Sequence, residues 1–185
     1  MDAITLLKAD HKTVTSLFTK FRKLGDNAFK SKREVVDAII EELSVHASIE
    51  ELVFYPAVRR EVHAADNEVL EALEEHHVAK WLLSELDGMD PKHERFDAKV
   101  SVLIESVKHH IREEETTLFP EVRQALGRKA LQELGDALEK AKAVAPTRPH
   151  PRTPDEPPAN LIVAPAAGLA DRALRVVGKG RRRTS

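Results

Sequence analysis

The chain has 185 residues, of which 42% are hydrophobic, and a formal net charge of −2 at pH 7, so its size suits one sizeable core better than two domains. It contains no cysteine, which excludes disulfides, thiolate nucleophiles, iron–sulfur clusters and Cys-type zinc sites. No apolar run has the length of a signal peptide core or a membrane span, so we expect a soluble cytoplasmic protein.

Apolar residues recur at helical spacing up to about residue 144, and no stretch in this part alternates like a β-strand. The pattern predicts an all-α protein with long helices at about 2–24, 31–63, 66–86 and 92–126, and a shorter fifth helix at about 128–144. Ser31 and Glu34 fit a capping box at the start of the second helix. Because the connections are short, we predict an antiparallel up-down four-helix bundle in residues 1–144, with the fifth helix packed on its outside.

Residues 145–185 differ from the rest of the chain in composition. Seven of the ten prolines lie between Pro146 and Pro165, and the 40 residues from 146 to 185 hold 8 Lys/Arg against 3 Asp/Glu. This composition predicts a disordered, proline-rich, basic tail. Its end, Arg181-Arg182-Arg183, would attract phosphates only weakly, so we expect no specific nucleic-acid partner, and the partner of the basic tail stays open.

The helical part contains an internal repeat. Residues 45–59 recur 64 positions later as 109–123, and each copy has a histidine, a glutamate four residues on and a proline ten residues on. The pair Asp10-His11 recurs 65 positions later as Glu75-His76. Residues four apart project from one face of an α-helix. Each repeat therefore supplies one helix with a histidine and one helix with a His-x-x-x-Glu pair.

The duplicated polar residues point to a metal site inside the bundle. They lie among the apolar residues of core-facing stripes, and burying unpaired carboxylates costs several kcal/mol unless a cation compensates them. Inward-facing histidines and glutamates on neighbouring helices are common metal ligands in bundles. The alternative is that these are polar core residues that bind no metal. It would have to explain why six such side chains occur in a duplicated pattern. The candidate ligands are His11, His46, Glu50, His76, His110 and Glu114.

Several neighbouring residues leave alternatives open. His77 would replace His76 as the ligand if the third helix is rotated. Pro56 and Pro120 each remove a backbone hydrogen bond and kink the helix, and the first kink would turn Tyr55 inward as a phenolate ligand or a proton donor. Glu51 and Glu115 lie about 140° from their histidines on a straight helix, which places them behind the ligands or in solvent. His109 is turned about 100° from His110 and is expected only to flank the site. Surface positions are expected for three other histidines: His63, His93 and His150.

Residues 1 to about 126 resemble the hemerythrin-like, or HHE cation-binding, family. The resemblance rests on the paired His-x-x-x-Glu-Glu motifs, which are followed by Phe-Tyr-Pro in one repeat and Leu-Phe-Pro in the other. It implies a four-helix bundle with two iron ions (Fe2+/Fe3+), bridged by the two glutamates and by an oxo, hydroxo or peroxo group. It also implies that the six candidate residues are the protein ligands.

The chain departs from the oxygen-carrying hemerythrins at two points. These carriers have a His-x-x-x-His pair on the third helix, whereas Ala72 and Lys80 occupy this spacing around His76. On the fourth helix they place an aspartate five residues after the histidine, whereas this chain has Glu114 four residues after His110. The site therefore offers fewer imidazoles and more open coordination, which argues against reversible oxygen carriage.

Imidazole and carboxylate ligands suit iron, manganese or zinc, and iron is the metal that the resemblance implies. We expect a non-haem di-iron protein that reacts with a small oxidant (H2O2, O2 or NO), with hydrogen peroxide decomposition as the leading activity in oxidative or nitrosative stress. One alternative is a module that binds O2 or NO reversibly, or senses redox or iron status, without turnover. Another is a helical interaction protein that holds no metal.

Overall fold

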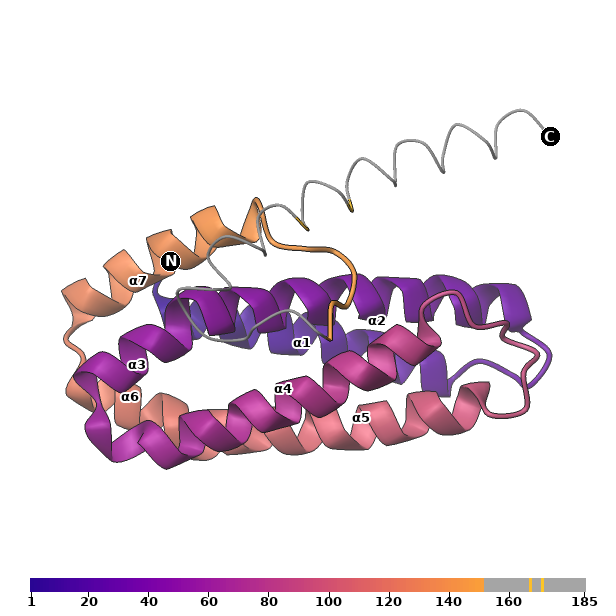
Figure 1. Ribbon diagram of the computed structural model, residues 1–185, viewed down its shortest axis with the longest axis horizontal. Coiled ribbons are helices and arrows are strands. Elements are labelled where there is room, and N and C mark those ends of the chain that lie inside the picture. Colours follow the sequence, from indigo (N-terminus) through magenta and orange to yellow (C-terminus); the bar gives the residue numbers. More distant parts are fainter. Residues whose placement is uncertain (152–166, 168–170, 172–185) are drawn as a thin grey trace.

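The computed structural model describes residues 1–151, 167 and 171, and in this part of the chain every regular element is a helix (Figure 1). The elements are α1 (Ala3–Arg22), α2 (Phe29–Ile49), η1 (Glu50–Phe54), α3 (Tyr55–Glu61), η2 (His63–Ala65), α4 (Asp66–Leu86), α5 (Phe96–Glu113), η3 (Glu114–Leu118), α6 (Phe119–Ala125) and α7 (Arg128–Lys142). Four rods, formed by α1, α2 with α3, α4, and α5 with α6, pack as a bundle, which confirms the predicted fold class.

The helix boundaries differ from the predicted ones where local capping decides them. Asp2 caps α1, because its carboxylate accepts hydrogen bonds from the backbone N–H and the hydroxyl of Thr5 at 3.0 and 2.8 Å. The capping box predicted at Ser31 is absent, since α2 begins earlier, at Phe29, and Ser31 lies within its first turn. Helix α5 begins at Phe96 and not near residue 92, because residues 91–95 form turns.

Both repeats contain a π-helical turn immediately before the proline-containing segment, where the sequence predicts a break. The backbone N–H of Tyr55 bonds to the carbonyl of Glu50, and the N–H of Phe119 bonds to that of Glu114, five residues back in each case. A π turn accommodates one extra residue, so it changes the face from which the following side chains project. Tyr55 is therefore buried, although a continuous α-helix would direct it away from His46.

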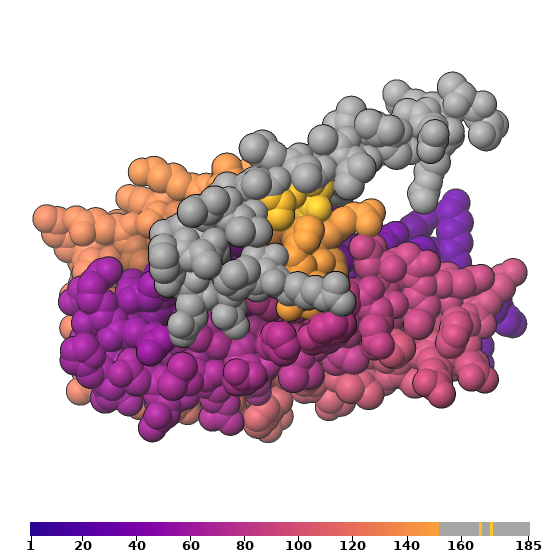
Figure 2. Space-filling view, viewed as in Figure 1, coloured from indigo at the N-terminus to yellow at the C-terminus, as the bar shows by residue number. Residues whose placement is uncertain are grey.

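Helix α7 packs on the outside of the bundle against α1, α2 and η1, as predicted for the fifth helix (Figure 1). Leu131 and Leu138 are buried in this contact. Gly135 lies so close to the N-terminus that a Cβ atom there would come within 2.0 Å of the carbonyl oxygen of Met1. In the space-filling view, α7 (orange) and α5 (pink) lie at opposite edges of the molecule (Figure 2).

The predicted disordered tail lies largely outside the described residues. Within them, Ala145 is buried, and the carboxylate of Asp171 accepts hydrogen bonds from the backbone N–H groups of Thr147 and Arg148 at 2.9 and 3.0 Å. Among the described helices, none combines the length and the apolar character that a bilayer crossing requires.

Candidate metal centre

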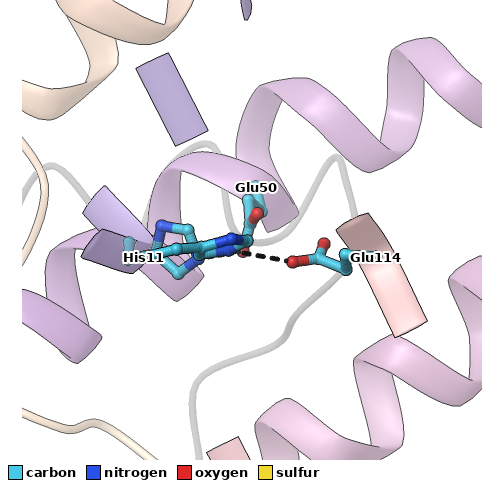
Figure 3. Close-up of side chains that lie close together, drawn as sticks. His11, Glu50 and Glu114 are labelled. Carbon is cyan, nitrogen blue, oxygen red and sulfur yellow. Dashed lines mark ion pairs between the residues drawn. The ribbon is translucent and has the colours of Figure 1, made fainter. Parts of the chain in front are cut away.

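The six candidate ligands meet in the middle of the bundle. They come from six elements, α1, α2, η1, α4, α5 and η3, and each is at most 7% exposed. Two hydrophobic clusters flank them along the bundle axis, so that on α1, for example, His11 lies between Leu7 and Val14. Figure 3 shows His11, Glu50 and Glu114 directed toward one another. The site is therefore a polar layer between two apolar ones.

Each glutamate lies between two histidines from different helices. The Oε2 atom of Glu50 is 3.1 Å from Nε2 of His46 and 3.4 Å from Nε2 of His76. The Oε2 atom of Glu114 is 3.1 Å from Nε2 of His11 (dashed in Figure 3) and 3.4 Å from Nε2 of His110. Two groups of possible donor atoms, each within 4.8 Å of one another, share Glu50. They are His11, His46, Glu50 and Glu114 in one group, and Glu50, His76 and His110 in the other.

A second ring of carboxylates faces the outer nitrogen of each histidine. The distances from Nδ1 are 2.9 Å for His11 to Glu115, 3.8 Å for His46 to Asp10, 3.0 Å for His76 to Glu51 and 2.7 Å for His110 to Glu75. At the three shorter distances, an Nδ1–H group donates to the carboxylate, so the Nε2 atom points into the site. Asp10 approaches His46 at ion-pair distance only.

This ring follows the internal repeat. The acidic residue before the first-helix histidine, Asp10 or Glu75, faces the second-helix histidine of the same repeat. The acidic residue after the central glutamate, Glu51 or Glu115, faces the first-helix histidine of the other repeat. The sequence placed Glu51 and Glu115 either behind the ligands or in solvent. The structure places both behind the ligands. The sequence analysis did not assign Asp10 and Glu75 to the site. Their repetition, each directly before a ligand histidine, could have indicated that they belong to it.

The buried donor atoms fit a bound cation. Several of them, fully enclosed, have no hydrogen-bond partner among the described residues: Nε2 of His11, both ring nitrogens of His46, both oxygens of Glu50 and Oε2 of Glu114. In addition, Nε2 of His76 lies 3.1 Å from Nε2 of His110, and both Nδ1 atoms face carboxylates. Ring nitrogens from two helices thus converge at one point of the site.

Glu50 and Glu114 respond oppositely to burial in this cluster. Burial, reinforced by the negative charge of Glu114, raises the pKa of Glu50 well above its ordinary value. Burial alone would also raise the pKa of Glu114, but the neighbouring charge of His110, together with the close approach of His11, lowers it. In the metal-free cluster Glu114 therefore gives up its proton more readily than Glu50. A bound cation would favour ionisation of both.

Tyr55 lies inside the site, as the prediction from the proline break allowed. Its hydroxyl donates to Oε1 of Glu114 at 2.9 Å and lies 3.5 Å from Nε2 of His76. Burial, together with the negative charge of Glu114, raises the pKa of Tyr55 well above its ordinary value, so the side chain is a neutral phenol. In the metal-free cluster the phenol is therefore a hydrogen-bond donor to Glu114.

The other histidines lie outside the cluster. His77, the alternative to His76, is exposed and accepts a hydrogen bond from Nε1 of Trp81 at 3.1 Å, because one residue along α4 turns the side chain by about 100°. His63 and His93 are exposed as expected, and His109, expected to flank the site, is exposed as well. His150, expected at the surface, is partly buried, with Nε2 3.3 Å from the carboxylate of Asp171.

Comparisons with known proteins agree with this geometry. The family model described as hemerythrin HHE cation binding domain matches residues 2–122. The chain is 27% identical over 167 residues to an uncharacterised hemerythrin-like protein of Schizosaccharomyces pombe, a match that covers 88% of this chain and 81% of that protein. It is also 29% identical over 143 residues to a DNA nickase of Nostoc, which covers 77% of this chain, but this chain spans only 40% of the length of that relative.

Among solved structures, the chain resembles a hemerythrin HHE cation binding domain-containing protein from Mycobacterium kansasii, with a TM-score of 0.65, 23% identity, and coverage of 77% of this chain and 88% of that chain. At this identity the likeness shows the fold. The family match spans the whole bundle and both halves of the His/Glu cluster, so the cluster is that of a metal-binding helical protein. The chain belongs to the hemerythrin HHE cation-binding family.

Proposed function

We propose that the bundle holds two iron ions in the His/Glu cluster and decomposes hydrogen peroxide in the cytoplasm. The observation that carries the proposal is the arrangement of four histidines around two glutamates, beside a small cavity that all four histidines line. The two groups of donor atoms would each hold one ion, with Glu50 common to both. When bound, two adjacent iron ions supply a two-electron redox couple, which matches the two-electron chemistry of peroxide.

The cavity limits the substrate to a small molecule. It measures about 30 Å³, room for about two water-sized molecules, and its walls include the apolar side chains of Leu43, Leu83 and Val107. Organic substrates do not fit into this space without movement of the helices. A peroxide or diatomic molecule does, so the size of the cavity supports a small oxidant.

The residues around the cavity would orient and move protons. The carboxylates on the Nδ1 side fix the imidazole rings, so that the Nε2 atoms keep their direction. Tyr55 carries the one phenolic proton of the site, 2.9 Å from Glu114. A phenol at this position can pass a proton to a carboxylate oxygen and recover it, which is the acid–base assistance that cleavage of an O–O bond requires.

The test is elemental analysis of protein from iron-replete cells, followed by measurement of oxygen evolution after addition of peroxide. We expect about two iron ions per chain and catalytic oxygen release. The variant with both Glu50→Ala and Glu114→Ala should lose the iron and the turnover together. Stoichiometric iron without turnover would refute the peroxide activity, and a reversible change of the visible spectrum with oxygen would then indicate a carrier. Iron occupancy unaffected by the double substitution would refute the site itself.

A further inference from the structure

The two halves of the bundle are alike at the centre but differ on their outer faces. In the first repeat, the outer positions beside the site are apolar and buried, and they are Ala3, Leu6, Val45 and Ile49. Helix α7 packs over this face. In the second repeat, the positions 65 or 64 residues later are acidic or ionisable, and they are Glu68, Glu71, His109 and Glu113. The duplicated site therefore has one closed, apolar side and one polar side.

The polar side is hollowed. A cavity of about 120 Å³ lies between α4, α5 and η3. Helices α4 and α5 lie on the side of the bundle away from α7 (Figure 1). Its outer wall carries four glutamates, which we name the acidic opening: Glu68, Glu71, Glu75 and Glu113. Its inner wall is formed in part by His110 and Glu114. The cavity thus joins the protein surface to two of the six residues of the buried cluster.

A triad of which two members, Glu75 and Glu113, line this cavity has the geometry of a cation site. The Nε2 atom of His109 lies 3.1 Å from Oε1 of Glu113 and 3.7 Å from Oε1 of Glu75, and one donor atom from each residue falls within 4.8 Å of the others. The second oxygen of Glu75 lies 2.7 Å from Nδ1 of His110. Glu75 therefore links this outer triad directly to the buried cluster.

Unpaired buried oxygens point to a ligand along the same path. Glu114 is 2% exposed and lines the cavity from inside, and its Oε2 atom has no hydrogen-bond partner among the described residues. The buried Oε2 atom of Glu68, on the outer wall, likewise has none. Carboxylate oxygens in such surroundings are stabilised by a cation, and a group of like charges at a cavity mouth raises the local concentration of cations.

We propose that the acidic opening is the uptake site for the metal, where the outer triad of Glu75, His109 and Glu113 captures a divalent cation and passes it to the buried cluster. The inference rests on the proposed function, because it requires the cluster to bind a metal ion. The matching face of the first repeat cannot serve, since apolar side chains and α7 cover it. Uptake therefore proceeds from one side of a nearly symmetric site.

The test measures the rate of metal uptake separately from its extent. Protein freed of metal by a chelator is mixed with Fe2+ without oxygen, unbound Fe2+ is followed with a coloured chelator, and final iron is determined by elemental analysis. The variant with Glu71→Gln and Glu113→Gln keeps all six central residues. We expect its initial uptake to be about tenfold slower, with an unchanged final iron content. High salt should slow the natural protein toward the rate of the variant.

The matched control changes the same number of charges on α7, with Glu133→Gln and Glu139→Gln, both exposed and remote from the cavity. It should load at the rate of the natural protein. Equal rates for the Glu71/Glu113 variant and the natural protein would overturn the uptake site, as would a loss of final iron, which would place these glutamates in the binding site itself. A natural protein that takes up no iron would instead refute the proposed function.

Discussion

Tyr55 is the site residue at which the two repeats differ most, because its counterpart 64 positions later is Phe119. The ring of Phe119 stacks on His11 with centroids 5.7 Å apart, whereas Tyr55 packs at 5.5 Å from His76 and adds a hydroxyl that reaches Glu114. The chain therefore already accommodates a phenylalanine at the equivalent place, which makes Tyr55→Phe a substitution that removes the hydroxyl and little else.

The Tyr55→Phe variant should retain its iron but decompose peroxide about ten- to a hundredfold more slowly. The hydrogen bond to an ionised carboxylate is worth about 1.5–3 kcal/mol, and its loss also removes the phenolic proton. The measurement is the initial rate of oxygen evolution per bound iron. Unchanged turnover with full iron would show that Tyr55 only packs, whereas loss of iron would make it necessary for metal binding.

His46 offers a test of burial through pH, in the metal-free protein. Burial lowers its pKa to about 4, from an ordinary value of 6.5. Between these values the unfolded chain binds a proton that the folded site does not, so the contribution of His46 to stability is complete above pH 6.5 and is lost as the pH falls toward 4. By this linkage, His46 alone costs roughly 2–3 kcal/mol of unfolding free energy between pH 7.5 and 4.5.

The measurement is urea denaturation in the presence of a chelator at the two pH values, for the natural protein and for His46→Gln. Glu50 and His110 have raised pKa values and titrate in the opposite sense, so the difference between the two proteins carries the prediction. The natural protein should lose roughly 2–3 kcal/mol more than the variant on acidification. If both proteins lost the same unfolding free energy between pH 7.5 and 4.5, His46 would be protonated at pH 4.5 in the folded protein as well as in the unfolded chain.

At the scale of elements, the docking of α7 depends on a close approach at Gly135. A Cβ atom there would come within 2.0 Å of the carbonyl oxygen of Met1 and 3.0 Å of the backbone of Asp2 and Ala3. The clash is with backbone, so either α7 or the capped start of α1 has to move. Gly135→Ala should therefore lower the unfolding free energy by about 1–3 kcal/mol, despite the better helix propensity of alanine.

Gly127→Ala is the matched control for this substitution. Gly127 precedes α7 with φ −68° and ψ 163°, a conformation open to alanine, and nothing lies within 4 Å of a Cβ atom there. Its unfolding free energy in urea should stay within about 0.5 kcal/mol of that of the natural protein. If Gly135→Ala proved equally neutral, α7 would not be held against the N-terminus as described.

The repeated elements also show what the sequence could predict. The spacing of His46 and Glu50, and its copy at 110 and 114, identified residues that do meet, because i and i+4 share a helix face and the apolar stripes define which face is inward. The π turns could not be derived in the same way. Proline predicted a break, but the i+5 hydrogen bond that buries Tyr55 depends on packing of the surrounding helices.

Contacts between helices could not be predicted from the sequence for a related reason. Glu115 faces His11 across the bundle, and Glu75 faces His110, only because the helices have a particular relative rotation and axial register. Periodicity indicates which face of one helix is inward, but not which residues of two helices are level. The same limit applies to the acidic opening, whose members come from α4 and from α5.

At the scale of the whole molecule, the metal should act as a cross-link. The candidate donors come from residues 11 to 114, on all four rods of the bundle, so a bound ion joins segments that separate on unfolding. A ligand that binds only the folded state at 100 times its Kd adds about 2.7 kcal/mol of stability, which for a protein of this size corresponds to a rise of roughly 5–10 °C in Tm. Addition of a chelator should reverse the rise.

The variant with Glu50→Gln and Glu114→Gln separates this stabilisation from other effects of metal. It removes the buried carboxylates, so its Tm should not respond to iron or chelator. Calorimetry of both proteins with and without Fe2+ decides the matter. A natural protein whose Tm ignores the chelator would show that the cluster is held together without a cation.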